Sequence, residues 1–235
     1  MMNFFTLQYE SIITISLAVV GFAVVIYAQS KINRAYNAYK KVNIKKRLSG
    51  VEVARKILDS NGLSSVYVLE TPGTLSDHYN PSRKVIKLSN SVFHGETISA
   101  ASVAAHECGH AIQDKEGYAM MKVRSLLAPV VGLVNYAGYF FLILSLIAGV
   151  MAYINASIIL VLIALVFQLV TLPVEFNASK RAFEELKKLD LIEPKEEEGV
   201  KKMLNAAAFT YVAGILSSIL QLIRLILMSQ NRNRR

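Results

Sequence analysis

The sequence predicts a mainly α-helical integral membrane protein that carries a small α+β module. Two features lead to this fold class: the composition, and the way the charges are distributed. Apolar residues make up 53% of the 235 residues and charged residues only 18%. The charged residues gather in blocks that flank hydrophobic runs. Three to four of these runs are candidates for membrane helices, so the lipid bilayer is the first partner that the sequence predicts.

The net charge of +9 is explained by these flanking blocks. A basic protein raises the question of nucleic acid, but no DNA- or RNA-binding motif accompanies the charge. We therefore expect no nucleic-acid partner. The chain has a single cysteine, Cys108, which excludes an internal disulfide.

Residues 12–28, IITISLAVVGFAVVIYA, form an uncharged run that predicts the first membrane helix. A cleaved signal peptide would carry positive charge before the run, whereas residues 1–11 contain Glu10 and no Lys or Arg. Basic residues follow the run instead: Lys31, Arg34, Lys40, Lys41, Lys45, Lys46 and Arg47. Because positive charge stays on the cytoplasmic side, we expect an anchor helix with its N-terminus outside.

Residues 48–124 have the pattern of a folded module outside the membrane. Amphipathic periodicity predicts helices, β-branched runs predict strands, and the Pro-Gly and Asn-Pro pairs predict a loop. The expected elements are, in order, a helix at 50–62, a strand at 66–69, a loop at 71–83, a strand at 84–88 and an alanine-rich helix at 97–113.

The longest uncharged stretch lies between Arg124 and Glu175. As a helix, at about 1.5 Å per residue, it would span roughly 75 Å, enough for two crossings. We predict a transmembrane hairpin over residues 126–174 with its turn at 149–157. The turn carries no Lys or Arg, which suits an external loop.

Two further helices are predicted near the C-terminus, a charged helix at 175–191 and a hydrophobic one at 206–228. The second has polar residues at helical spacing, namely Thr210, Ser217, Gln221 and Arg224. Both a spanning and an interfacial position are open for it. Four full crossings would place the Arg-rich tail outside, against the charge rule, which favours a last helix that does not fully span.

The segment that carries chemistry is His106-Glu107-Cys108-Gly109-His110, within the predicted helix at 97–113. Residues four apart lie on one helix face, so the two imidazoles can bind one Zn²⁺ ion. Glu107 points to the neighbouring face, from which it can accept a proton from a zinc-activated water. A chance match is expected in on the order of one chain per hundred, and the helical context favours a metal site.

Other metal-ligating residue types near the motif are weaker candidates. Cys108 projects from another side of the helix and is expected to be a small buried hydrophobe. Asp114 lies two turns from His106, too far to share its metal. His94 is expected to be a solvated surface residue. For His78 a role in substrate or oxyanion binding and a plain turn position are both open.

Two carboxylates compete for the third ligand position. Glu116 stands where the HExxHxxGxxH pattern has its third histidine, but Gln113 replaces the glycine of that pattern. Glu175 is the stronger candidate, because its face of the predicted helix is small and apolar, with Ser179, Ala182 and Phe183. A carboxylate there would be costly without a partner, and a metal would supply one.

The hairpin gives the physical reason why Glu175 can reach a motif so far along the chain. Two crossings leave and return to the same membrane face. We expect Pro173 to break the end of the second crossing, so that a new helix presents Glu175 from its first turn.

The sequence resembles the YugP-like neutral zinc metallopeptidases of bacterial membranes. The resemblance covers most of the chain, in the segments SGVEVARKIL, LSDHYNPSRKVIKLS, AAHECGHAIQ, LPVEFNASKRA and LNAAAFTYVAGIL. It implies a multi-pass membrane protease with His106 and His110 as zinc ligands and Glu107 as the catalytic acid/base. In similar membrane gluzincins an E-x-x-x-D segment completes the site. That segment maps onto Glu175, with Ser179 in place of the aspartate.

We therefore expect one membrane-embedded peptidase domain over residues 1–235, with a zincin-like module. Its function would be that of a zinc-dependent endopeptidase at the cytoplasmic face of the cell membrane, acting on peptide or membrane-protein substrates. An extended substrate could pair with the edge of the strand at 84–88. An intramembrane protease and a catalytically silent membrane scaffold are the alternatives. The sequence does not define the oligomeric state.

Overall fold

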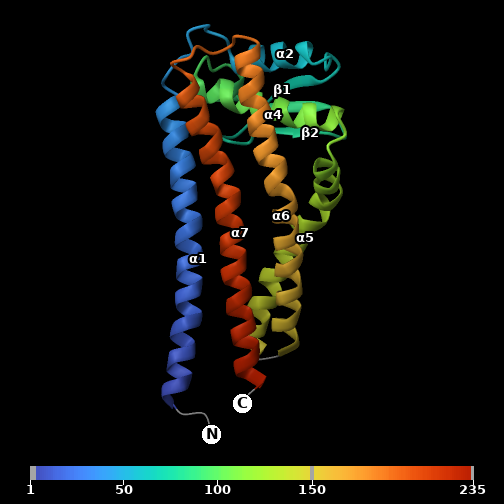
Figure 1. Ribbon diagram of the computed structural model, residues 1–235. Helices are drawn as coiled ribbons and strands as arrows, with labels where there is room; N and C mark the ends of the chain where they lie inside the picture. The colour runs from blue at the N-terminus through green and yellow to red at the C-terminus, as the bar shows by residue number, and fades with distance from the viewer. Residues whose placement is uncertain (1–3, 149–150, 234–235) are drawn as a thin grey trace. The chain divides into compact units, whose positions relative to one another are not determined.

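This computed structural model describes residues 4–148 and 151–233, which form two compact units. Of the described residues, unit 1 comprises 4–28, 126–148, 151–170 and 210–233, and unit 2 comprises Gln29–Ser125 and Thr171–Phe209. The described elements are α1 (Phe4–Tyr39), α2 (Gly50–Ser60), β1 (Tyr67–Thr71), β2 (His78–Asn80), β3 (Val85–Ser89), α3 (Asn90–Phe93), α4 (Ile98–Lys115), α5 (Ala119–Ala148), α6 (Met151–Lys188) and α7 (Glu197–Asn233) (Figure 1).

Four helices are long and apolar enough to cross a membrane: α1, α5, α6 and α7. Together with the small sheet, they confirm the predicted fold class of a mainly α-helical membrane protein with an α+β module. The helices are longer than the hydrophobic runs, because polar residues at both ends continue the helical hydrogen bonding. By length and composition α7 matches the other three, so the partial span expected from the charge of its tail stays a prediction.

The predicted turn of the hairpin is shorter in the structure. Helix α5 ends at Ala148 and α6 begins at Met151, and residues 149 and 150 lie outside the described ranges.

The predicted break at Pro173 is wrong, since α6 runs without interruption from Met151 to Lys188. Proline fixes φ at a value compatible with a helix, but it removes the hydrogen bond to the carbonyl of Leu169 and its ring crowds that carbonyl, at a cost of about 3 kcal/mol that the long helix tolerates here. Glu175 therefore projects from the interior of a long helix. No separate helix begins at residue 175.

Unit 2 contains a three-stranded sheet in the order β1-β3-β2. β1 pairs in parallel with β3, and β2 pairs with β3 in antiparallel orientation, so that Val68 and Tyr79 both lie opposite Ile86. β3 is the central strand and is almost entirely buried. The expectation that a substrate pairs with the edge of the strand at 84–88 is therefore wrong, because both edges of that strand are occupied. Strand β2 lies inside the predicted loop at 71–83, where turn residues conceal it.

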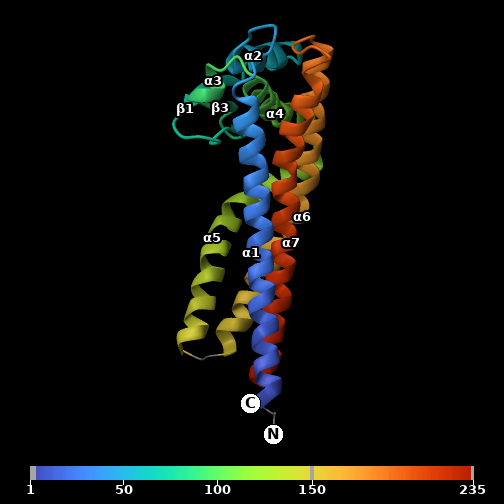
Figure 2. The ribbon, with the colours of Figure 1, turned by 90° about the vertical axis from the view of Figure 1, so that its left-hand side faces the viewer.

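Helices cover this sheet and bring the motif helix into place. Figure 2 shows α3 beside β1 and β3, with α4 close to them. Helix α2 begins with a capping box between Ser49 and Glu52. Helix α2 packs on α4, whose buried residues include the small side chains of Ala101, Ala104 and Cys108.

Helix α4 also approaches α6 closely at Gly109. A Cβ atom at Gly109 would lie 2.4 Å from the carbonyl oxygen of Ala178, so no larger residue fits without a shift of the backbone. This contact sets the two helices close enough for their side chains to share one site.

Candidate metal centre

The structure brings three of the predicted site residues together between α4 and α6. His106 and His110 lie one turn apart on α4, with ring centroids 4.8 Å apart, and Glu175 faces them from α6. Oε2 of Glu175 lies 3.2 Å from Nε2 of His106 and 3.7 Å from Nε2 of His110. The ligand atoms of all three residues lie within 4.8 Å of one another.

This set of donors fits a zinc ion. At metal–ligand distances of about 2.0–2.2 Å, two ligands of a tetrahedral site lie about 3.3–3.5 Å apart, and both Nε2–Oε2 distances are near that range. Two imidazoles and one carboxylate also form a ligand set that catalytic zinc sites use, which leaves the fourth position open. These three residues could therefore hold a zinc ion.

The Glu175 carboxylate is 2% exposed and has a second charged neighbour. Nη1 of Arg124, in the first turns of α5, lies 3.0 Å from Oε1 of Glu175. The contact is an ion pair whose angles fall outside hydrogen-bond geometry, since Oε1 has no hydrogen-bond partner among the described residues. Arg124 thus neutralises a carboxylate that would otherwise be costly to bury.

Partners on both sides determine the protonation of His106. Burial lowers the pKa of His106, but the hydrogen bond to Glu175 and the charges of Glu107 and Glu175 outweigh burial and raise it above its usual 6.5. The other ring nitrogen, Nδ1, lies 3.2 Å from Oγ of Ser179. A hydroxyl can both donate and accept, so Ser179 suits either tautomer of His106. Ser179, one turn after Glu175 on α6, therefore contacts a histidine of the candidate metal centre.

The tautomer of His110 follows from the partners of Gln113. Nε2 of Gln113 donates to the carbonyl oxygen of Val174 at 2.8 Å and to Oδ1 of Asn177 at 2.9 Å. A carbonyl only accepts, so the amide orientation is fixed and Oε1 faces Nδ1 of His110, 3.0 Å away. Nδ1 must then carry the hydrogen, which leaves the lone pair on Nε2 free for a metal.

Glu107 lies beside this group without belonging to it. It follows His106 on α4 and is 7% exposed. Its carboxylate forms no hydrogen bond or ion pair with another residue that the structure describes. Its carboxylate is therefore available to a water molecule or a substrate.

The structure places the other sequence candidates away from the three residues. Glu116 pairs with Arg181 at 2.6 Å, and the hydrogen bond lowers its pKa. The thiol of Cys108 is buried against the carbonyl oxygen of Ala54, and burial raises its pKa well above the usual value. Asp114 accepts a hydrogen bond from Tyr79 at 2.7 Å.

The two remaining histidines lie on the surface of unit 2. His94 pairs with Glu70 at 3.3 Å, and His78 bonds through its ring to the carbonyl oxygen of Ser76 at 2.8 Å. Neither belongs to the described group of possible metal ligands.

Sequence reasoning missed two residues that contact the site, Arg124 and Gln113. The sequence holds an indication for each of them. Gln113 lies three residues after His110 and so on the same face of the helix. Arg124 is the last charged residue before the long uncharged stretch, and Glu175 is the first one after it.

The fold and the site define a class, that of α-helical membrane proteins with a candidate metal site formed by two histidines of one helix and a distant glutamate. The model of a protein family described as "Putative neutral zinc metallopeptidase" matches residues 14–230, and the chain belongs to this family. The chain is also 42% identical over 217 residues to "Putative membrane protease YugP" of Bacillus subtilis (strain 168), which covers 92% of this chain and 96% of the relative. No solved structure matches. A zinc ion is the metal that this family implies.

Proposed function

We propose that the protein is a membrane-bound zinc-dependent endopeptidase with His106, His110 and Glu175 as its metal ligands. The observation that carries the proposal is the buried group of two imidazoles and one carboxylate, with Glu107 next to it. Membership of a family of zinc peptidases supports the same reaction class. Zinc binding and peptide hydrolysis are the two parts of the proposal that the experiment below tests.

Each residue has a role that its surroundings support. A zinc ion, when bound, supplies a Lewis acid that lowers the pKa of water to about 7. Glu107 accepts the proton of the attacking water and returns it to the leaving amine. Gln113 keeps Nε2 of His110 unprotonated. Arg124 holds Oε1 of Glu175, which leaves Oε2 directed at the two histidines.

The substrate in this proposal is an extended polypeptide that pairs with strand β2. β3 has no free edge, so the outer strands β1 and β2 are the ones open to a further strand. β2 packs against α4, and the hydrogen bond from Tyr79 to Asp114 joins the two elements. A peptide along β2 would therefore lie beside the helix that carries the motif, with His78 exposed next to it.

We also propose that α1, α5 and α6 cross the cell membrane and that unit 2 faces the cytoplasm. The seven basic residues from Lys31 to Arg47 support this orientation, because they follow the apolar part of α1. With its N-terminus outside, α1 places residues 31–124 inside, and the α5–α6 hairpin returns Glu175 to the same side.

The test is zinc content and peptide hydrolysis of the purified full-length chain in detergent or lipid. The proposal predicts about one zinc per chain and cleavage of an unfolded, casein-like substrate that stops with a chelator and returns with zinc. Glu107→Gln should keep the zinc and lose the cleavage, because glutamine cannot accept the proton. Near wild-type turnover of Glu107→Gln, or a zinc-loaded wild type that cleaves no peptide, would contradict the proposal. The second result is what a silent scaffold would give.

A further inference from the structure

Unit 1 contains a charged side chain, Arg224, that the proposed reaction does not use. Arg224 lies on α7, within a segment apolar enough to cross a membrane, and it belongs to the polar stripe of the last helix. A charged side chain in such a segment is costly, and it commonly marks the site of a ligand or a partner. The surroundings of Arg224 therefore indicate what it binds.

The guanidinium of Arg224 is only partly satisfied. Nη1 donates to Oε1 of Gln221 at 3.3 Å, whereas Nε is buried and has no hydrogen-bond partner among the described residues. None of the described carboxylates forms an ion pair with Arg224. Glu10 is the single acidic residue in the segments of unit 1, and it precedes the apolar run of α1. Arg224 thus offers a positive charge and a free donor to an anion from outside the chain.

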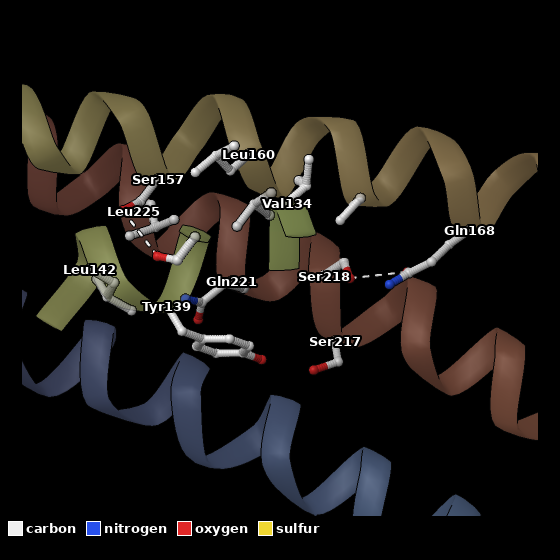
Figure 3. Close-up of a pocket in the computed structure, with 13 residues that line it drawn as sticks. Val134, Tyr139, Leu142, Ser157, Leu160, Gln168, Ser217, Ser218, Gln221 and Leu225 are labelled. Atoms are coloured by element: carbon white, nitrogen blue, oxygen red, sulfur yellow. Dashed lines mark hydrogen bonds between the residues drawn. The ribbon is translucent and has the colours of Figure 1, made fainter. Parts of the chain in front are cut away.

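Gln221 connects Arg224 to a cavity in unit 1. The cavity has a volume of about 270 Å³ and is bordered by α5, α6 and α7. Tyr139, Ser217 and Gln221 are among the side chains that line it (Figure 3). Because a guanidinium only donates, the contact with Arg224 holds the amide oxygen of Gln221 and leaves its NH₂ group without a partner in the described part of the chain. The cavity therefore presents donors beside a positive charge.

The cavity can be reached from the surface that would face lipid. Tyr139 lines it and is 68% exposed, whereas Ser157 and Ala164 on its α6 side are buried. Its volume lies near the lower end of the range of about 300–1,000 Å³ that ligand pockets have. A head group and the beginning of a chain fit such a volume, and Leu142 and Leu160 give the chain an apolar wall.

The position of Arg224 along α7 also suits a head group. The apolar run of α7 ends at Met228, and the next residue, Ser229, donates to Oδ1 of Asn155 near the start of α6 at 3.2 Å. Arg224 precedes Ser229 by one and a half turns, about 7.5 Å along the helix axis. A guanidinium this close to the end of an apolar segment can meet an anionic head group whose chain lies in the hydrocarbon.

We propose that this cavity binds the anionic head group of a membrane amphiphile, with Arg224 as the countercharge. The guanidinium edge that contains Nε matches the paired oxygens of a carboxylate or a phosphate. Gln221 and Ser217 would donate further hydrogen bonds to the same oxygens. Fatty acids and anionic phospholipids share this chemistry. None of these residues belongs to the candidate metal centre, so the inference does not rest on the peptidase activity.

Binding can be measured by native mass spectrometry of the purified full-length protein in a neutral detergent. Two pairs of probes separate the two sources of the anion. Oleate compared with oleyl alcohol tests the carboxylate, and dioleoylphosphatidylglycerol compared with dioleoylglycerol tests the phosphate. In at least one pair we expect the anionic member to bind roughly 10- to 100-fold more tightly, and that pair identifies the source.

Variants of Arg224 test whether this side chain is responsible. Arg224→Gln removes the charge and should abolish the preference for the anionic member. Arg224→Lys keeps the charge but loses the planar fork, so it should bind the anion roughly 3- to 10-fold more weakly than the wild type. Arg232→Gln is the matched control, because it removes the same charge about two turns further along α7, and it should bind like the wild type.

Ser217→Ala keeps the inference testable if Arg224→Gln does not fold. This variant removes one donor of the lining, and it should weaken binding of the anion roughly 2- to 10-fold.

Three results would overturn the inference. The first is equal binding of the charged and uncharged members in both pairs; if a preference then appeared in Glu10→Gln, Glu10 would be the partner of Arg224. The second is an anion preference that survives in Arg224→Gln, or, where that variant does not fold, unchanged binding by Ser217→Ala. The third is an equal loss in Arg232→Gln, which would assign the preference to the basic tail as a whole.

Discussion

Arg124 and Glu175, the two charges that bound the longest uncharged stretch of the chain, lie 3.0 Å apart. The hairpin between them thus closes on an ion pair at the candidate metal centre. Glu175 has its two oxygens divided between partners, with Oε1 beside Arg124 and Oε2 beside the two histidines. The expectation that a hairpin would turn distance along the chain into closeness in space is confirmed by this geometry.

Removal of Arg124 should destabilise the metal-free protein. Arg124→Leu leaves the buried Glu175 carboxylate without its cation, and Arg124 is itself partly exposed, so we expect a loss of about 1–3 kcal/mol in the free energy of unfolding. The loss should shrink when zinc is added, because the metal supplies the missing positive charge. The measurement is the thermal unfolding of both forms.

Arg47→Leu is the control for this experiment, because Arg47 pairs with Glu96 on the surface and should contribute less than about 0.5 kcal/mol. A metal-free Arg124→Leu protein as stable as the wild type would show that the pair does not support Glu175.

Gln113 should control zinc affinity through the tautomer of His110. Gln113→Leu removes the acceptor at Nδ1 of His110, so we expect zinc affinity to fall roughly 10- to 100-fold. Competition titration with a zinc-binding dye measures the affinity, and histidine ¹⁵N chemical shifts report the tautomer directly. Ser102→Ala is the control, since this buried serine on the same helix bonds only to the backbone oxygen of Ile98. Unchanged affinity together with an unchanged tautomer would refute the role of Gln113.

The affinity for zinc should increase with pH over a range that His106 determines. In the metal-free protein its pKa lies above 6.5, so protonated His106 contributes stability below that value, and the contribution is lost as the pH rises through the folded-state pKa. Zinc needs the unprotonated ring, so its affinity should still be rising at pH 6.5 and level off only above it.

Proton NMR of metal-free protein would locate this titration, and Glu175→Gln should lower the pKa of His106, because it removes a charged hydrogen-bond partner. A wild-type His106 that titrates at or below 6.5 would be at odds with the proposed geometry.

The orientation in the membrane can be tested by cysteine labelling in intact cells. Ser91→Cys, on the exposed surface of unit 2, should react with an impermeant reagent only after permeabilisation. Asn233→Cys should behave in the same way if α7 does not fully cross. The native Cys108 is buried with a raised pKa, so background labelling should be low. Labelling of Ser91→Cys from outside would reverse the topology, whereas labelling of Asn233→Cys alone would show that α7 crosses.

Local patterns in the sequence predicted the features that depend on near neighbours. Helical spacing placed His106 and His110 on one face of α4, and amphipathic periodicity predicted α2. The small apolar face around Glu175 indicated that its carboxylate is buried beside a partner.

Features that depend on tertiary packing could not be predicted in this way. The orientation of Gln113 is fixed by the carbonyl of Val174, a residue 61 positions away. The central place of β3 depends on a strand hidden among turn residues. The continuity of α6 through Pro173 depends on the tertiary packing of the buried residues that follow it, Val174 and Ala178, which offsets the cost of a proline inside a helix. None of these three features leaves a periodic pattern of apolar residues in the sequence.

The most direct measurement of the central claim is X-ray absorption at the zinc edge, combined with zinc titration of Glu175→Ala and Glu116→Ala. The account predicts two imidazole nitrogens at about 2.0–2.1 Å and oxygen ligands at about 2.0–2.2 Å. Glu175→Ala should lose zinc affinity by more than the roughly 10- to 100-fold that outer partners contribute, while Glu116→Ala should bind zinc like the wild type. An unchanged spectrum and affinity in Glu175→Ala, beside loss of both in Glu116→Ala, would contradict it and make Glu116 the third ligand.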